Sequence, residues 1–326
     1  MKRPWLAPLT PIYVAGVSMR NLRIDNGWEH VRRLRFPVVS IGNLSTGGAG
    51  KTPLTIALAN ALTKRGLDVD VLSRGYGRRS LFPTRVNPKG FAEEFGDEPL
   101  LIARATGVPV YVAAERYRAG QLAEAEALQS EHKSRLAIHL LDDGFQHRQL
   151  ARNVDILLMN QSDWRDSLLP SGNLREPIAA VNRASVVAIP AEEPQLEAEL
   201  QAWGWRGPVW RLYRKMDVPP ISGPVAAFCG IARPQQFFMG LASAGLRLVS
   251  RNLFRDHHRY TATDVRRLLS AAQKAGATAL VTTEKDHVRL GPLASVFSAS
   301  IPLHTARLHL EIEGREAAID WLLDRL

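Results

Sequence analysis

The 326-residue sequence lacks the features that mark several classes of protein. Its single cysteine, Cys229, excludes an internal disulfide or a cysteine-rich zinc site and favours a reducing compartment. No internal repeat or low-complexity run is present, and a charged fraction of 23% excludes wholesale disorder. What the sequence does have is length and 45% apolar residues, which suit about two domains with sizeable cores.

Negatively charged residues are also few relative to positively charged ones. The chain has 42 Lys and Arg against 32 Asp and Glu, a net charge of +10, which indicates an anionic partner without identifying it. Half of this excess lies in the first 35 residues, where the only acidic residues are Asp25 and Glu29. The basic residues there are Lys2, Arg3, Arg20, Arg23, Arg32, Arg33 and Arg35.

A long apolar run is missing as well. Residues 4–19 are uncharged, but prolines interrupt them, and they are shorter than the roughly 20 apolar residues that span a bilayer. An apolar stripe at helical spacing nonetheless predicts an amphipathic helix, which would lie either on an anionic membrane surface or on the protein's own core. The stripe consists of Leu6, Leu9, Ile12, Tyr13 and Val17. Pro8 and Pro11 disfavour a cleaved signal peptide, and no small-x-small site follows.

Predicted strands and helices alternate along the chain, which favours a mostly parallel sheet with helices on both faces. The clearest strands are residues 37–41, 68–73, 108–113, 136–144, 154–160, 184–191 and 278–283. We expect an N-terminal membrane-associated segment over 1–35, a nucleotide-binding domain over 36–206, a Gly- and Pro-rich hinge over 207–224 and a smaller α/β domain over 225–326.

Residues 45–52, STGGAGKT, stand between a predicted strand and a predicted helix and carry the strongest chemical signal. Glycines let backbone N–H groups surround phosphate oxygens, and the helix N-terminus adds positive potential. Lys51 would reach the β- and γ-phosphates, and the Thr52 hydroxyl would coordinate Mg²⁺. The usual first glycine of this motif is replaced by Ser45. The predicted phosphate-binding residues are Ser45, Thr46, Gly47, Gly48, Ala49, Gly50, Lys51 and Thr52.

Two carboxylate pairs are candidates for the rest of the site. Asp142 and Asp143 end an apolar strand, and carboxylates at that edge of a parallel sheet face the ligand crevice, where they would hold Mg²⁺; otherwise they form a turn before Gly144. Asp97 and Glu98 precede a proline that suits a first helical turn, so they either cap that helix or provide a base for an attacking hydroxyl.

With these motifs in hand, the sequence resembles the tetraacyldisaccharide 4′-kinase family, the lipid A 4′-kinases. The resemblance covers residues 38–287 in an ordered set of segments. They are SIGNLSTGGAGKTP (40–53), LSRGYGR (72–78), GDEP (96–99), AERYRAG (114–120), LDDGFQH (141–147), LLPSGNLREP (168–177), FCGIARP (228–234), DHH (256–258) and TTEKD (282–286).

The resemblance implies a P-loop kinase fold with two α/β domains, ATP as co-substrate and Mg²⁺. The acceptor would be the 4′-hydroxyl of a tetraacylated disaccharide 1-phosphate, the lipid A precursor, at the cytoplasmic face of the bacterial inner membrane. It further implies that Asp97 is the base and pairs with His257 from the second domain. The implied phosphate and metal residues are Lys51, Thr52, Glu98, Asp142 and Asp143.

Basic residues and one further motif complete the candidate site. The arginines that would bind substrate phosphate or ATP are Arg74, Arg116, Arg118 and Arg175. Residues 282–286, TTEKD, are expected near the nucleotide base or as an ordinary strand-to-helix turn.

The sequence leaves two other function classes open. A P-loop GTPase or ATPase binding switch is the alternative to the kinase, although Asp286 directly follows Lys285, unlike the guanine-reading T-K-x-D pattern. A nucleic-acid-dependent ATPase would rest on net charge alone. We expect neither a nucleic-acid partner nor an obligate protein partner.

Overall fold

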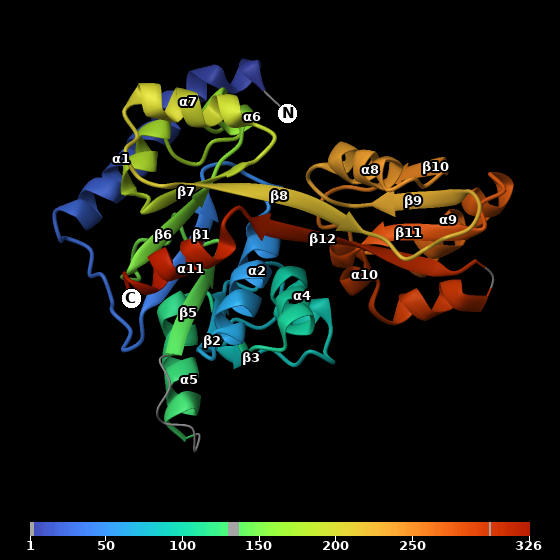
Figure 1. The fold of residues 1–326 in the computed structure, drawn as a ribbon, viewed down its shortest axis with the longest axis horizontal. Helices are drawn as coiled ribbons and strands as arrows, with labels where there is room; N and C mark the ends of the chain where they lie inside the picture. Colours follow the sequence, from blue (N-terminus) through green and yellow to red (C-terminus); the bar gives the residue numbers. More distant parts are fainter. Residues whose placement is uncertain (1–2, 130–136, 300) are drawn as a thin grey trace.

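The computed structural model describes residues 3–129, 137–299 and 301–326. Lys2 and residue 136, which entered the sequence predictions, lie outside these ranges. One sheet of twelve strands runs through both parts of the molecule, in the order β10-β9-β11-β12-β8-β7-β6-β1-β5-β2-β4-β3 (Figure 1). Every neighbouring pair is parallel except β12–β8 and β3–β4. The predicted mostly parallel α/β sheet is therefore confirmed.

The strands are β1 (Val38–Asn43), β2 (Asp68–Ser73), β3 (Thr84–Arg85), β4 (Val110–Val112), β5 (Ala137–Asp142), β6 (Val154–Leu158), β7 (Val186–Pro190), β8 (Val209–Asp217), β9 (Val225–Cys229), β10 (Leu248–Leu253), β11 (Ala279–Thr283) and β12 (Leu303–Ile312).

The α-helices are α1 (Thr10–Asp25), α2 (Lys51–Lys64), α3 (Ala92–Phe95), α4 (Asp97–Thr106), α5 (Arg116–Gln129), α6 (Gln161–Trp164), α7 (Pro194–Trp203), α8 (Pro234–Ser243), α9 (Ala262–Lys274), α10 (Glu284–Leu290) and α11 (Arg315–Leu323). The 3₁₀ helices are η1 (Pro4–Leu9), η2 (Ile178–Arg183) and η3 (Gly291–Ala299).

The larger lobe is built around the central strands β1, β5, β6 and β7. Every residue of these strands is buried, as expected for parallel strands covered on both faces. One face carries a core shared with α2, α4 and α11, and the other carries cores shared with α5, η2 and α7. The carboxyl ends of β1 and β5 therefore meet at one edge, where β1 leads into the predicted phosphate-binding loop and β5 ends at Asp142.

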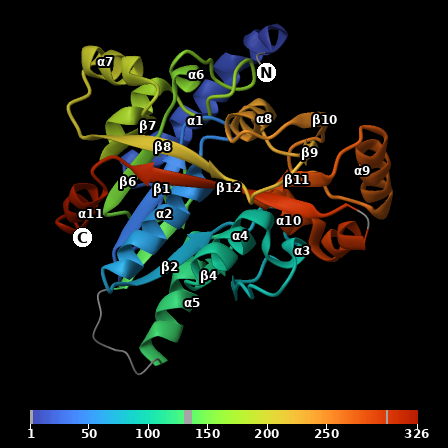
Figure 2. The same cartoon turned by 45° about the vertical axis from the view of Figure 1, so that its right-hand side comes forward.

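The smaller lobe repeats this layering on strands β9, β10 and β11. Helix α8 packs on one face through Phe237, Phe238 and Leu241, and the other face packs against α9, α10 and η3. Figure 2 shows α8 and α10 on opposite sides of these strands.

The two lobes are joined by the antiparallel strands β8 and β12, paired from Arg307–Asp217 to Ile312–Leu212. Half of the predicted hinge, residues 207–224, is thus strand β8, whose beginning pairs with β7. The predicted smaller domain also differs at its end. Leu310 and Ile312 of β12, with α11, belong to the core of the larger lobe. The smaller lobe is therefore an insertion between two strands of the larger one.

At the N-terminus, η1 and α1 form the predicted helical segment, but its apolar stripe is divided between two environments. Tyr13 and Val17 line a cavity described below. The strongly exposed apolar side chains on this segment are Trp5, Leu9, Ile12, Met19 and Leu22. Across the described ranges, we find no helix with the length and apolar character required to span a bilayer.

Candidate active site

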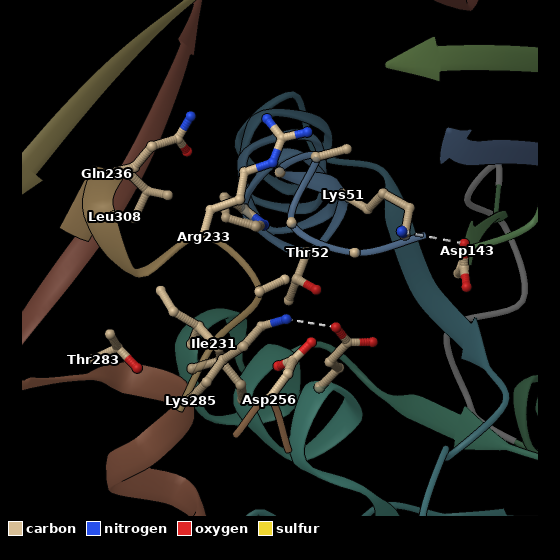
Figure 3. A pocket seen from close by; sticks show the side chains of 18 of the residues that line it. Lys51, Thr52, Asp143, Ile231, Arg233, Gln236, Asp256, Thr283, Lys285 and Leu308 are labelled. Atoms are coloured by element: carbon tan, nitrogen blue, oxygen red, sulfur yellow. Dashed lines mark hydrogen bonds and ion pairs between the residues drawn. The ribbon is translucent and has the colours of Figure 1, made fainter. Parts of the chain in front are cut away.

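A cavity of about 930 Å³ lies between the two lobes and is lined from both. The larger lobe contributes residues 47–53, the end of β5 and part of α1, and the smaller lobe contributes α8, His257 and the beginning of α10. Figure 3 shows side chains of both lobes pointing into it. The cavity thus lies at the carboxyl edge of the parallel strands, as the sequence predicts.

The predicted phosphate-binding loop (residues 45–52) connects β1 to α2 and bends at three glycines. Gly47, Gly48 and Gly50 have φ values of 86°, 43° and 94°, in the left-handed region that favours glycine. A Cβ atom on Gly48 would also lie only 2.8 Å from Cγ of Arg233 in the smaller lobe. These glycines therefore give the loop its curvature and let the smaller lobe approach it closely.

The ends of this loop have different surroundings. Gly47 to Thr52 line the cavity, whereas Ser45 and Thr46 do not. Ser45 is buried and accepts a hydrogen bond from Nδ2 of Asn43 at 3.0 Å. Of the predicted phosphate-binding residues, Ser45 and Thr46 thus lie away from the cavity surface.

Lys51 is the first residue of α2 and points along the cavity wall toward the end of β5. Its ammonium group donates to Oδ1 of Asn43 at 2.9 Å and lies 3.4 Å from Oδ1 of Asp143 (Figure 3). A phosphate group in the loop would meet this ammonium directly.

Asp142 is the most deeply buried carboxylate of the site, with 1% exposure. It accepts hydrogen bonds from the hydroxyls of Thr55 at 3.2 Å and Ser73 at 3.5 Å. Burial, reinforced by the nearby charges of Glu98 and Asp143, raises the pKa of Asp142 to about 7. The cations of the site therefore do not fully balance the charge of an ionised Asp142.

Asp143, the next residue in the chain, differs from Asp142 because two cationic side chains lie close to its carboxylate. It has a left-handed φ of 52°, which turns it toward Lys51 and toward Arg175, whose Nη1 lies 3.2 Å from the carboxylate. Burial alone would raise the pKa of Asp143, but these two cations outweigh it and lower the pKa.

The second carboxylate pair begins helix α4. Asp97 is buried, and its Oδ2 is contacted by Nε and Nη2 of Arg289 at 2.7 and 2.5 Å and by Nδ1 of His257 at 3.1 Å. Glu98 lines the cavity and is 2.5 Å from Nζ of Lys285. Despite its burial, the pKa of Asp97 is lowered by its bond to His257 and the charge of Arg289. Both carboxylates of the larger lobe are thus bound by groups of the smaller lobe.

His257 is the counterpart of Asp97 at the cavity surface. Its backbone has a left-handed φ of 57°, and its ring lies 5.3 Å from that of Tyr76. The hydrogen bond to Asp97 raises the pKa of His257. His257 lines the cavity, whereas Asp97 lies behind it. The predicted interdomain pair is therefore in contact, with the imidazole facing the space where a ligand would lie.

Comparison with known proteins agrees with this geometry. The model of the tetraacyldisaccharide-1-P 4′-kinases, LpxK, matches residues 2–326 of the chain. The chain belongs to this family. The predicted kinase activity toward the 4′-position of a tetraacyldisaccharide 1-phosphate is confirmed at this level, and the binding-switch alternative is not favoured.

Individual relatives of the kinase cover nearly its whole length. It is 42% identical to a tetraacyldisaccharide 4′-kinase of Koribacter versatilis over 97% of each chain, and 38% identical to that of Geobacter metallireducens over 98% of this chain and 97% of the other. It also resembles the crystal structure of LpxK from Aquifex aeolicus in complex with ATP, with 30% identity, a TM-score of 0.75 and 98% of each chain covered.

The four predicted substrate arginines of the kinase are placed differently. Arg74 and Arg175 line the cavity. Arg116 is 7% exposed, and burial lowers the pKa of its guanidinium to about 10. Arg118 is exposed and pairs with Glu115 at 3.3 Å, so the structure does not bring it to the cavity.

Sequence reasoning missed the cations of helix α10. Lys285 belongs to the TTEKD segment, which was expected near the nucleotide base or as a turn, and Arg289 follows it by one helical turn. Both bind the predicted catalytic and metal carboxylates, and their i, i+4 spacing after a strand was the available signal.

Proposed function

We propose that this kinase transfers the γ-phosphoryl group of ATP to the 4′-hydroxyl of a tetraacylated glucosamine disaccharide 1-phosphate, giving the bis-phosphorylated lipid A precursor. The observation that carries the proposal is that one cavity contains both a phosphate-binding loop and the Asp97–His257 pair. Family membership and the likeness to an ATP complex of LpxK support ATP as the phosphoryl donor.

In this proposal the triphosphate of ATP lies in the loop formed by residues 47–52. The backbone N–H groups there and the beginning of α2 stabilise phosphate oxygens. Lys51 lies beside Asp143 with its ammonium group in the cavity wall, so it neutralises charge on the β- and γ-phosphates.

Magnesium fits the acidic side of the cavity. Asp142 is buried, accepts only hydroxyl hydrogen bonds in the described structure and has a raised pKa, so a cation beside it is favourable. No group of three His, Cys, Asp or Glu side chains suited to a metal occurs within the described ranges, but kinases hold Mg²⁺ with one or two carboxylates and substrate phosphates. When bound, the ion neutralises charge on the transferring group. The residues that would hold it are Thr52, Glu98, Asp142 and Asp143.

The Asp97–His257 pair would accept the proton of the attacking 4′-hydroxyl. The oxygen of that hydroxyl forms a bond to the γ-phosphorus while the bond to the β–γ bridging oxygen breaks and ADP leaves. A neutral sugar hydroxyl is a poor nucleophile, and a positioned base contributes about 10²- to 10⁴-fold. Because the two residues come from different lobes, the pair forms only where the lobes meet.

We assign recognition of the acceptor's phosphate to Arg175 and Arg74 at the cavity surface. Arg175 is held by Asp143, and Tyr13 of α1 donates to the carbonyl oxygen of Arg175 at 2.9 Å. Arg116 lies deeper and supports the positive potential from behind. Arg118 has no role in this assignment because it lies outside the cavity.

We further propose that η1 and α1 lie on the anionic cytoplasmic face of the inner membrane as a peripheral attachment. Tyr13 and Val17 of α1 close the cavity, whereas Trp5 of η1 and Ile12 of α1 are apolar side chains that are 75% and 71% exposed. Transferring two such side chains from water contributes about 3–6 kcal/mol. The acceptor lipid would then enter the cavity beside the bilayer that contains it.

The direct test incubates the purified protein with Mg-ATP and the tetraacyl disaccharide 1-phosphate and follows the bis-phosphorylated product by mass spectrometry. Lys51→Ala should abolish product formation without unfolding the protein, and Lys64→Ala on the exposed side of the same helix is the matched control. Full activity of Lys51→Ala would remove the phosphate-loop assignment. GTP preference without product would favour the binding switch instead.

A further inference from the structure

Helix α10 brings Lys285 to the cavity, opposite the phosphate-binding loop. Its beginning is rigidly held, because the buried Asp286 carboxylate accepts from the backbone N–H of Gly230 at 3.1 Å and from the hydroxyls of Tyr260 at 3.0 Å and Thr283 at 2.7 Å. The neighbouring residue, Lys285, therefore starts from a fixed backbone position in the smaller lobe.

The ammonium group of Lys285 crosses from the smaller lobe to the larger one. It lies 2.5 Å from Oε1 of Glu98, and its side chain lines the same cavity as Thr52. Figure 3 shows Lys285 and Thr52 pointing toward the same part of this cavity. The Lys285 side chain is 27% exposed and lines the cavity, so a ligand bound there can contact it.

The other cation of α10 serves a different purpose. Arg289 is 5% exposed, does not line the cavity, and binds Asp97, Asp286 and the carbonyl oxygen of Gly230. Arg289 already holds α10 against α4 through Asp97. The packing of these two helices therefore does not require the ion pair between Lys285 and Glu98. The position of Lys285 in the cavity points instead to a ligand.

We propose that Lys285 is a catalytic residue of the smaller lobe that turns from Glu98 to the γ-phosphate when ATP binds. This inference rests on the proposed function. Lys51 approaches the triphosphate from the larger lobe and Lys285 approaches it from the smaller one, so the transferring group is neutralised from two sides. Lys285 keeps its proton throughout, since the proton of the acceptor hydroxyl goes to the Asp97–His257 pair.

A consequence is that Lys285 distinguishes ATP from ADP. ADP has no γ-phosphate, so with ADP the ammonium keeps its bond to Glu98 and contributes little to binding. A charge-assisted hydrogen bond to the γ-phosphate should strengthen ATP binding about 10- to 100-fold.

The test measures binding of Mg-ADP and of the β,γ-methylene analogue of Mg-ATP by isothermal titration calorimetry, without lipid. Lys285→Met should lose about 10- to 100-fold in affinity for the analogue and less than about threefold for ADP. Lys285→Arg should retain most of the analogue affinity, and Lys274→Met, an exposed lysine of α9, should behave as wild type. With lipid, kcat of Lys285→Met should fall while KM for the lipid is unchanged.

Two results would overturn the assignment. If analogue and ADP affinities fall together with the melting temperature, Lys285 only ties α10 to α4. If neither affinity changes, the lysine does not contact phosphate. A wild-type protein that binds the analogue more tightly than Lys285→Met but never phosphorylates the lipid would sustain this inference while refuting the proposed function.

Discussion

His257 and Asp97 meet across the two lobes, with Nδ1 of the histidine 3.1 Å from Oδ2 of the aspartate, and only the histidine lines the cavity. Neither lobe contains the pair by itself. The contact therefore links proton transfer to the approach of the lobes, which also removes water from the reacting groups.

Asp97→Asn should lower kcat about 10²- to 10⁴-fold because the amide cannot accept the hydroxyl proton or stabilise a charged imidazole. Binding of the ATP analogue should change little, since Asp97 does not line the cavity. Steady-state kinetics with saturating lipid checks the first expectation and calorimetry the second. Near-normal kcat in Asp97→Asn would show that the pair is not the base.

Asp142→Asn should stabilise the protein in EDTA at pH 8. The pKa of Asp142 is raised to about 7, so in the folded protein its ionisation is unfavourable, and this cost grows as pH rises from about 4 to 7 and then stays constant. Removing the charge should raise the free energy of unfolding by about 2–4 kcal/mol above pH 7. Chemical denaturation in EDTA measures this. The same variant should lose the stabilisation that Mg²⁺ gives wild type, and a variant that keeps it would contradict the metal assignment.

His139 should make stability depend on alkaline pH. It is fully buried, with Nδ1 2.7 Å from Asp70 and Nε2 3.5 Å from Glu124. Burial opposes its charge, but these carboxylates raise its pKa to about 9. Because the folded pKa exceeds the unfolded one, the stabilisation is complete below about pH 6.5 and is lost as pH rises through about 9, a change of about 3 kcal/mol.

The measurement compares urea unfolding at pH 6.5 and 9.5 for wild type and His139→Asn. The variant should be less stable at the lower pH and should show a flatter pH dependence over this window. An equal slope in both proteins would mean that other groups titrate here.

Arg289→Met should destabilise the protein by about 3–5 kcal/mol, because it leaves the buried carboxylate of Asp97 without its cation. Arg289→Lys should recover part of this loss. Thermal unfolding of both variants gives the comparison. A methionine variant as stable as wild type would show that the contact does not hold α10 against α4.

Replacing Trp5, Ile12 and Met19 by serine should weaken binding to vesicles that contain anionic phospholipid, since each of these side chains is more than half exposed. The remaining arginines leave an electrostatic attraction that high salt should remove. The matched control replaces Leu81 and Phe82, which are also strongly exposed but lie elsewhere in the chain. Cosedimentation of all three proteins reports the difference; equal binding would contradict the role of η1 and α1.

The strands with continuous apolar runs were predictable from sequence, because burial on both faces demands such runs. Strand β8 was not, since its alternating burial lies in a Gly- and Pro-rich stretch that also suits a hinge. In the site, the local sequence pattern was enough to predict the phosphate-binding loop before α2 and the position of Asp142 and Asp143 at the end of a strand. The contacts of Lys285 with Glu98 and of Arg289 with Asp97 join positions 187 and 192 residues apart in the chain, which no local pattern specifies.

The smaller lobe is inserted between β8 and β12, and the last strand and α11 complete the core of the larger lobe. A ribosome delivers the chain from its N-terminus, so the whole inserted lobe emerges before Leu310, Ile312 and Leu322 do. The larger lobe, although it begins first, is therefore the last to be finished during synthesis.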